Sequence, residues 1–89
     1  MNDHCFHKKV HESGKKCNRN DYLDDYETNA GIDECAIGCS TKEGCEYFSH
    51  YSLVEDGGTW CNFYSACSVI EHEDDDYEFN GVWKLTCGK

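Results

Sequence analysis

The fold of this chain is decided by residues 35–48, which read CAIGCSTKEGCEYF. Three cysteines stand in this stretch with three and then five residues between them, and a phenylalanine follows the third cysteine. Within and just ahead of the stretch, the apolar residues from Ile32 to Cys39 follow the i, i+3, i+4, i+7 spacing of one helix face. The spacing predicts a helix over residues 32–42 that carries two sulfur atoms inward.

Polar residues and a glycine mark the ends of the predicted helix. Asp33 or Asn29 can cap the N-terminus, and Asp33 and Glu34 suit the positive end of the helix dipole. Gly44 is a stop signal beyond the last apolar position. The sequence therefore predicts a short helix with defined ends.

After the helix, the apolar period changes to two, which is typical of strands. Residues 47–53 (YFSHYSL) and 60–64 (WCNFY) alternate in this way around the turn-forming run at 55–58 (EDGG), so a β-hairpin is expected. One helix among antiparallel strands gives a small α+β fold. Further strands are expected at residues 4–6, 22–26 and 82–87.

Eight of the 89 residues are cysteines, at positions 5, 17, 35, 39, 45, 61, 67 and 87. A chain of this length builds only a small core, and this cysteine density is typical of extracellular domains stabilised by disulfides. The even count leaves no cysteine over for nucleophilic catalysis, and the spacing does not fit a structural zinc site. We therefore expect four disulfides and a secreted protein, outside the cell or in the lumen of a secretory organelle.

The expected helix limits which cysteines can pair. Cys35 and Cys39 stand at i and i+4, so their Cβ atoms are about 5 to 6 Å apart, whereas a disulfide needs roughly 3.5 to 4.5 Å. Each of the two must therefore bond elsewhere. Cys39 can then bond to Cys45 at the helix exit, and Cys35 can bond to Cys61. Cys5 and Cys87 lie near the chain ends and can join the terminal strands.

These cysteines and their neighbours resemble the PAN/apple domain family. The pattern C-x3-C-x5-C-x2-F at 35–48, followed by CNF at 61–63, is similar to the core of that family. The resemblance implies one domain over residues 1–89, with its core at about 5–87 and about five antiparallel strands cradling one α-helix. It implies the disulfides Cys35–Cys61, Cys39–Cys45 and Cys5–Cys87, and Cys17 and Cys67 then pair by elimination.

The resemblance implies binding rather than catalysis. PAN/apple domains mediate protein or carbohydrate contacts in extracellular chains, including apicomplexan microneme adhesins, and no catalytic motif is visible in the sequence. We therefore expect a non-catalytic adhesion module without a cofactor, cut from a larger secreted multidomain protein, that recognises a protein or a glycan on a cell surface or in a secreted complex. Alternatives are a small secreted effector, such as a toxin or protease inhibitor, and a structural spacer in a tandem apple array.

The charge narrows the class of partner. Lys and Arg number 8 and Asp and Glu number 18, which gives a net charge of −10. Such a surface repels nucleic acid and anionic membranes, and no apolar run is long enough to insert into a bilayer. The expected partners are therefore proteins, glycans or neighbouring domains of the parent chain.

Candidate binding residues follow from the strand alternation. If Phe48 and Phe63 face the helix, aromatic and amide side chains of the two hairpin strands share the opposite face. Flat rings beside polar groups suit stacking against a sugar or anchoring a protein. In the other interpretation, the segment between Cys5 and Cys35 folds over these rings and buries them. The candidates are Tyr47, Tyr51, Trp60, Asn62 and Tyr64.

Two further groups have weaker patterns for metal binding. His4, His7 and His11 have a spacing that suits a transition metal only if the segment is helical, whereas a strand separates the rings. Residues 71–78 are rich in carboxylates but lack the spacing of a calcium loop. We read them as a solvated acidic loop, or as a contact for a basic partner. No metal site is expected.

Overall fold

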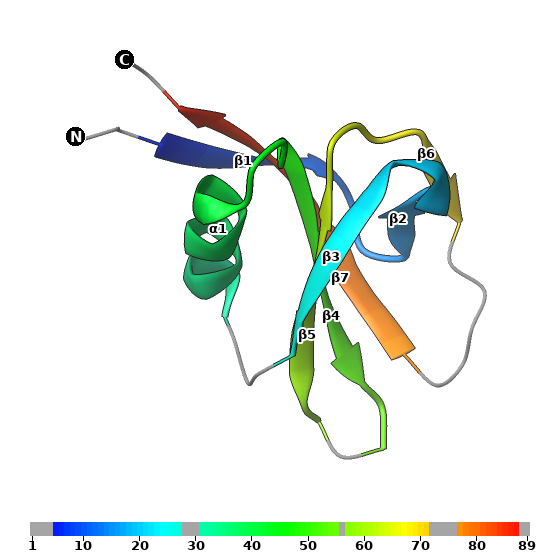
Figure 1. The fold of residues 1–89 in the computed structure, drawn as a ribbon. Helices are drawn as coiled ribbons and strands as arrows, with labels where there is room; N and C mark the ends of the chain where they lie inside the picture. Colours follow the sequence, from blue (N-terminus) through cyan, green and yellow to red (C-terminus); the bar gives the residue numbers. More distant parts are fainter. Residues whose placement is uncertain (1–4, 28–30, 56, 72–76, 88–89) are drawn as a thin grey trace.

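The structure is a computed structural model in which residues 5–27, 31–55, 57–71 and 77–87 are described (Figure 1). It contains one α-helix, α1 (Ile32–Thr41), and a short 3-10 turn, η1 (Arg19–Asp21). The strands are β1 (Cys5–His11), β2 (Lys15–Cys17), β3 (Tyr22–Glu27), β4 (Tyr47–Leu53), β5 (Thr59–Tyr64), β6 (Val69–Glu71) and β7 (Tyr77–Cys87).

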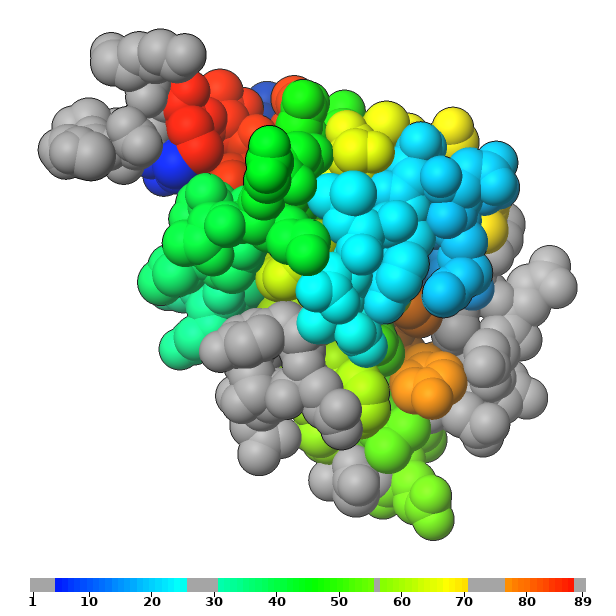
Figure 2. All heavy atoms as spheres, viewed as in Figure 1, coloured from blue at the N-terminus to red at the C-terminus, as the bar shows by residue number. Residues whose placement is uncertain are grey.

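Five of the strands form one antiparallel sheet in the order β1-β7-β4-β5-β3. The helix covers one face of this sheet, and a two-stranded ribbon of β2 and β6 lies on the other side (Figure 1). In Figure 2 the blue and cyan residues of β2, η1 and β3 occupy the centre and right of the view, and the helix lies to their left. The predicted small α+β fold is confirmed, and the ribbon is an addition to it.

The helix begins and ends close to the predicted positions, but its cap differs. Gly31 is the N-cap, and the Glu34 carboxylate accepts a hydrogen bond from the Gly31 N–H at 2.9 Å. The prediction that Asp33 caps the helix is wrong, because Asp33 already lies in the first turn; Asn29 lies outside the described residues. Gly44 follows the helix with a φ of +85°, as expected of a stop signal. No helix in the described part of the chain is long and apolar enough to span a membrane.

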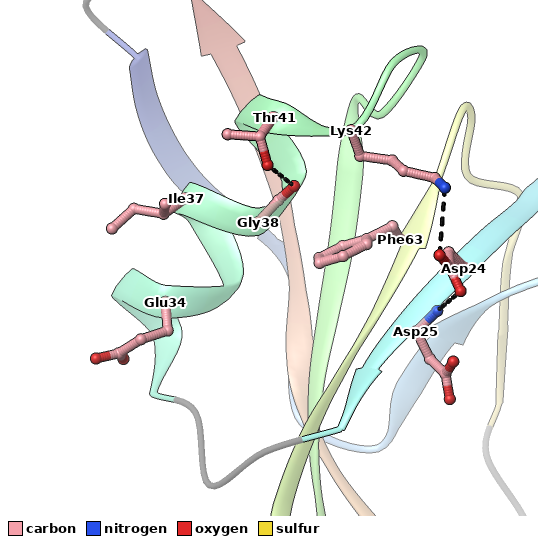
Figure 3. A pocket seen from close by; sticks show the side chains of 8 residues that line it. All are labelled: Asp24, Asp25, Glu34, Ile37, Gly38, Thr41, Lys42 and Phe63. Atoms are coloured by element: carbon pink, nitrogen blue, oxygen red, sulfur yellow. Dashed lines mark hydrogen bonds and ion pairs between the residues drawn. The ribbon is translucent and has the colours of Figure 1, made fainter.

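The main core lies between α1 and the sheet. Phe48 of β4 stacks on Trp83 of β7 with 5.7 Å between ring centroids, and Phe63 of β5 lies under the helix. Gly38 faces Phe63 so closely that an added Cβ would stand 2.7 Å from the ring (Figure 3). The buried members of this core are Cys35, Ala36, Cys39, Phe48, Cys61, Phe63, Trp83 and Leu85.

A second, smaller core lies on the opposite face. Cys17 of β2 packs there with Tyr64 of β5 and Val82 of β7, and all three are almost fully buried. Strands β2 and β6 were not predicted from the sequence, because a strand of three residues is too short to show a period. What holds them is the antiparallel pairing of residues 15–17 with residues 69–71 and the adjacent Cys17–Cys67 disulfide.

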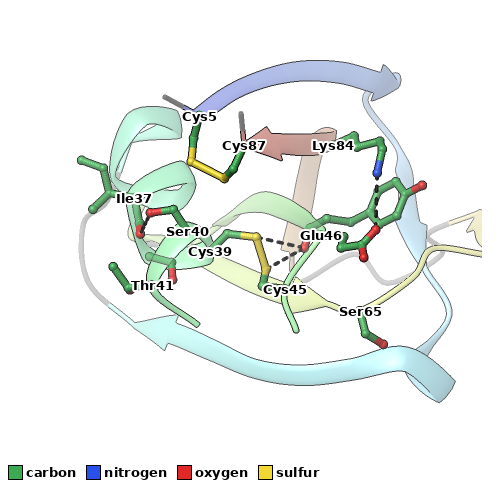
Figure 4. Close-up of a disulfide and its surroundings, with 12 residues drawn as sticks. Cys5, Ile37, Cys39, Ser40, Thr41, Cys45, Glu46, Ser65, Lys84 and Cys87 are labelled. Atoms are coloured by element: carbon green, nitrogen blue, oxygen red, sulfur yellow. Dashed lines mark hydrogen bonds and ion pairs between the residues drawn. A yellow bond between two sulfur atoms is a disulfide. The ribbon is translucent and has the colours of Figure 1, made fainter. Parts of the chain in front are cut away.

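The eight cysteines form four disulfides, and none is free. Cys39–Cys45 closes the exit of α1, and Cys5–Cys87 joins β1 to β7 at positions directly opposite each other (Figure 4). The four pairs are those expected from the sequence: Cys5–Cys87, Cys17–Cys67, Cys35–Cys61 and Cys39–Cys45. Each face of the sheet therefore has its cover fixed by at least one disulfide.

Candidate ligand-binding site

The predicted binding residues lie on the sheet face opposite α1. Tyr47 is directly across from Tyr64, and Tyr51 is directly across from Trp60, so each pair shares a face of the sheet. Tyr47 and Tyr64 belong to the smaller core around Cys17, on the far side from the helix. The alternation of the hairpin strands therefore places these side chains as the sequence indicated.

An exposed aromatic platform does not form, because two of the rings are buried. Tyr51 is 7% exposed and Tyr64 is 2% exposed. Tyr51 stacks on Phe79 of β7 at 4.7 Å between centroids, and Cys17 of the ribbon packs over Tyr64. Of the two interpretations of this face, burial by the segment between Cys5 and Cys35 holds for Tyr64, and the exposed platform is wrong for both residues. Trp60 and Asn62 are half-buried.

The ribbon leaves a pocket of about 330 Å³ between itself and the sheet, which we call the ribbon pocket. Three of the five predicted residues line it, namely Tyr51, Asn62 and Tyr64. The charged residues of the lining were not predicted from the sequence, because only the tertiary fold brings them together. They are Lys16 of β2, Arg19 of η1 and Asp25 of β3.

Three hydroxyl groups of the ribbon pocket, those of Tyr22, Tyr51 and Tyr64, are neutral hydrogen-bonding groups. Burial raises the pKa of both Tyr51 and Tyr64, so each phenol keeps its proton at neutral pH. The Asn62 side-chain amide donates to the Tyr64 hydroxyl at 3.3 Å. Burial also raises the pKa of Tyr22 at the pocket wall, with a further contribution from Asp25. These groups can each donate or accept a hydrogen bond toward a bound ligand.

Both basic residues of the pocket rest on aromatic rings. The Arg19 guanidinium lies 4.5 Å from the centroid of Tyr22, and the Lys16 ammonium lies 5.7 Å from that of Phe79. Neither forms an ion pair with a carboxylate of the described residues. A cation held on a ring face is kept in place while its remaining N–H groups stay available.

A second hollow, of about 380 Å³, lies between α1 and β3 (Figure 3). Phe63 lies between the helix and the strand, and the Lys42 ammonium reaches across to the Asp24 carboxylate at 3.2 Å. The Asp25 N–H and Lys42 together lower the pKa of Asp24, which is fully ionised at neutral pH. Lys42, the one cation among the described residues that line this groove, is therefore paired with a carboxylate, and Asp25 and Glu34 add two further carboxylates to the lining. The cations of the ribbon pocket have no such partner among the described residues.

The histidine and acidic patterns do not gather into a site among the described residues. His7 and His11 lie on the extended strand β1, which removes the helical spacing that a shared metal requires. His4 lies outside the described residues, as do positions 72–76 of the acidic run. Among the residues that the structure describes, no group of three or more His, Cys, Asp or Glu side chains could hold a metal ion.

No protein-family model, no curated protein and no solved structure matches this chain. Support for a function therefore comes from the fold, the cysteine pattern and the ribbon pocket.

Proposed function

We propose that this protein is a non-catalytic extracellular binding module of the PAN/apple type that recognises carbohydrate through the ribbon pocket. The observation that carries the proposal is the pocket itself, where buried tyrosine rings, protonated hydroxyls and an amide face one cavity. The cysteine pattern and the arrangement of five antiparallel strands with one helix support the family. Four disulfides support an extracellular location.

The lining of the pocket suits a sugar for two reasons. A sugar ring presents apolar C–H faces, which stack on aromatic rings such as Tyr77, a half-buried residue of the pocket wall. Its hydroxyl groups both donate and accept, and they match Asn62, Tyr64 and the carboxylate of Asp25. A volume of about 330 Å³ is near the lower end of the range for small-molecule sites, which fits the end of a glycan chain.

The charges of the pocket favour binding over hydrolysis. Enzymes that cleave glycosidic bonds use two carboxyl groups, roughly 5 to 10 Å apart, on either side of the bond. Asp25 is the one carboxylate among the described residues that line the pocket. A ligand bound there would meet a hydrogen-bond acceptor but no described partner for acid–base catalysis.

The position of the pocket suits a module within a longer adhesive chain. The beginning of β1 and the end of β7, which the Cys5–Cys87 disulfide joins, lie side by side near α1 and away from the ribbon (Figure 1). Neighbouring domains connected through these ends would therefore leave the ribbon pocket accessible. Cell adhesion through a surface glycan is the role that this arrangement supports best.

A glycan array tests the proposal directly. The oxidised protein is applied with calcium and with a chelator, beside the double variant Tyr51→Phe and Tyr64→Phe, which removes two pocket hydroxyls and keeps both rings. Tyr47→Phe is the matched control, because Tyr47 shares the face but does not line the pocket. We expect defined glycan signals that fall at least about 10-fold in the double variant and persist in the control.

Two results would contradict the proposal. Signals that survive in the double variant would place the binding site elsewhere on the protein. A blank array for the folded protein would exclude the glycans tested and favour recognition of a protein partner.

A further inference from the structure

We infer that the sugar held in the ribbon pocket carries a carboxylate, which binds Arg19 and Lys16. This inference rests on the proposed function, because it names the class of sugar that the same pocket takes. Sialic acids and uronic acids are sugars of this class.

The charge of the pocket is opposite to that of the protein. The whole chain has a formal net charge of −10 and only 8 basic residues. Two of these, Lys16 and Arg19, line one pocket, where Asp25 is the single described carboxylate. Tyr51 and Tyr64 stay neutral in the pocket, because burial raises the pKa of both. The described lining therefore has a local excess of positive charge in an acidic protein.

The backbone around Arg19 is well defined. Arg19 opens η1, and the Asn18 side chain caps this turn by accepting a hydrogen bond from the Asn20 N–H at 2.9 Å. The guanidinium then lies over the Tyr22 ring, which holds its plane while leaving its N–H edge open. A guanidinium presents two parallel N–H groups to a carboxylate, and such charge-assisted bonds are among the stronger hydrogen bonds in proteins.

Asp25 would determine the orientation of a sugar bound in the pocket. It lies on β3, whereas Lys16 and Arg19 lie on β2 and η1, so the carboxylate and the cations come from different walls. Asp25 repels an acidic group and accepts hydrogen bonds from sugar hydroxyls. A carboxylated sugar would therefore turn its acid toward the ribbon and its hydroxyls toward β3.

The test compares one sugar with and without its negative charge. The probes are 3′-sialyllactose and its methyl ester, which differ only at the carboxylate, titrated calorimetrically into the oxidised protein. We expect the acid to bind about 10-fold more tightly than the ester, because the ester cannot form the charge-assisted pair. Glucuronic acid and glucose form a second pair, with and without a carboxylate, and they test whether the pocket takes a uronic acid instead of a sialic acid.

Variants test whether Arg19 is the residue that binds the carboxylate of the sugar. Arg19→Gln should remove the preference for the acid, while Arg19→Lys, which keeps the charge, should retain part of it. Lys8→Gln is the matched control, because Lys8 is exposed on β1 and its loss changes the net charge by the same amount. In the control, the preference for the acid should be unchanged.

The outcomes separate this inference from the proposed function. Equal affinity for acid and neutral forms, in both probe pairs, overturns the inference and leaves carbohydrate recognition standing. A preference that persists in Arg19→Gln overturns the role of Arg19 in the same way. Absence of binding by every sugar, together with a blank array, overturns the proposed function and the inference with it.

Discussion

The two faces of the sheet are covered in different ways, and only one cover leaves room for a ligand. On one face, the apolar side of α1 packs directly on the sheet, and Gly38 lets the helix approach Phe63 closely. On the other, the three-residue strand β2 buries Cys17, while its neighbour Lys16 lines the ribbon pocket. A helix of ten residues offers an apolar stripe, whereas a three-residue strand offers little more than one buried side chain. The difference separates a stabilising face from a face that can bind.

Each cover is nevertheless anchored by a disulfide. Cys35–Cys61 joins α1 to β5, and Cys17–Cys67 joins the ribbon to the segment after β5. Because the two covers are anchored independently, one can be released while the other stays. Loss of either disulfide should therefore affect mainly the face that it covers.

Release of the helix cover should have the largest effect on stability. Replacing Cys35 and Cys61 with Ala opens a link between residues 26 positions apart and removes two sulfurs from the main core. We expect the free energy of unfolding to fall by about 5 kcal/mol, at the upper end of the range for losing a disulfide from a small domain. Urea denaturation measures this change. A loss below about 1 kcal/mol would contradict the assignment of the helix face as the stabilising one.

Removal of the Cys17–Cys67 disulfide should reduce stability less than removal of Cys35–Cys61, but it should reduce ligand binding more. We expect the Cys17→Ala and Cys67→Ala pair to lower the free energy of unfolding by about 3 to 4 kcal/mol, since the loop is long but Cys67 is only half-buried. The helix signal in circular dichroism should remain at low temperature, while glycan signals disappear. Full retention of glycan binding in this variant would show that the ribbon does not form the site.

The Gly38→Ala substitution tests how closely α1 packs on the sheet, because helix propensity and packing predict opposite changes in the free energy of unfolding. Helix propensity alone predicts that Ala stabilises the helix by about 1 kcal/mol over Gly. The new Cβ would stand 2.7 Å from the Phe63 ring, so we expect a net loss of about 1 to 2 kcal/mol instead. Thermal unfolding of this variant and of Ile37→Ala, an exposed control, measures the difference. A stabilised Gly38→Ala variant would mean that α1 lies farther from β5 than described.

The buried tyrosines should make the ribbon face sensitive to alkaline pH. Burial raises the folded-state pKa of Tyr51 and Tyr64 above the ordinary value of 10.0. Their protonated forms therefore contribute stability that is complete below pH 10 and is lost as pH rises through the folded pKa. Absorbance at 295 nm should show some of the six tyrosines titrating only as the protein unfolds. If all six titrated near pH 10 with the fold intact, the described burial would be wrong.

The sequence predicted the regular parts of this fold well. The helix and the strands β4 and β5 carry long, clear periods, and the cysteine positions in that helix exclude a bond between Cys35 and Cys39. Strand β1 runs to His11 although it was expected only at residues 4–6, because the polar pair Lys8 and Lys9 interrupts the apolar alternation. Strand β7 begins at Tyr77, five residues before its predicted start.

The candidate site was only partly predictable, and the reason is physical. Tyr51, Asn62 and Tyr64 stand in strong strand patterns, so their shared face could be read from the alternation. Lys16 and Arg19 lie in elements of three residues that have no period, and their positions depend on the ribbon pairing. A local pattern cannot show which side chains a distant disulfide will bring over a sheet.

The most direct test of this account is a two-dimensional amide NMR titration of the oxidised, ¹⁵N-labelled protein with 3′-sialyllactose. We predict shift changes at the amides of Arg19, Asn62 and Tyr64, which surround the ribbon pocket, while the amides of α1 stay in place. Changes confined to α1 and β3 around Phe63 would place the ligand in the other groove and contradict the assignment of the binding face.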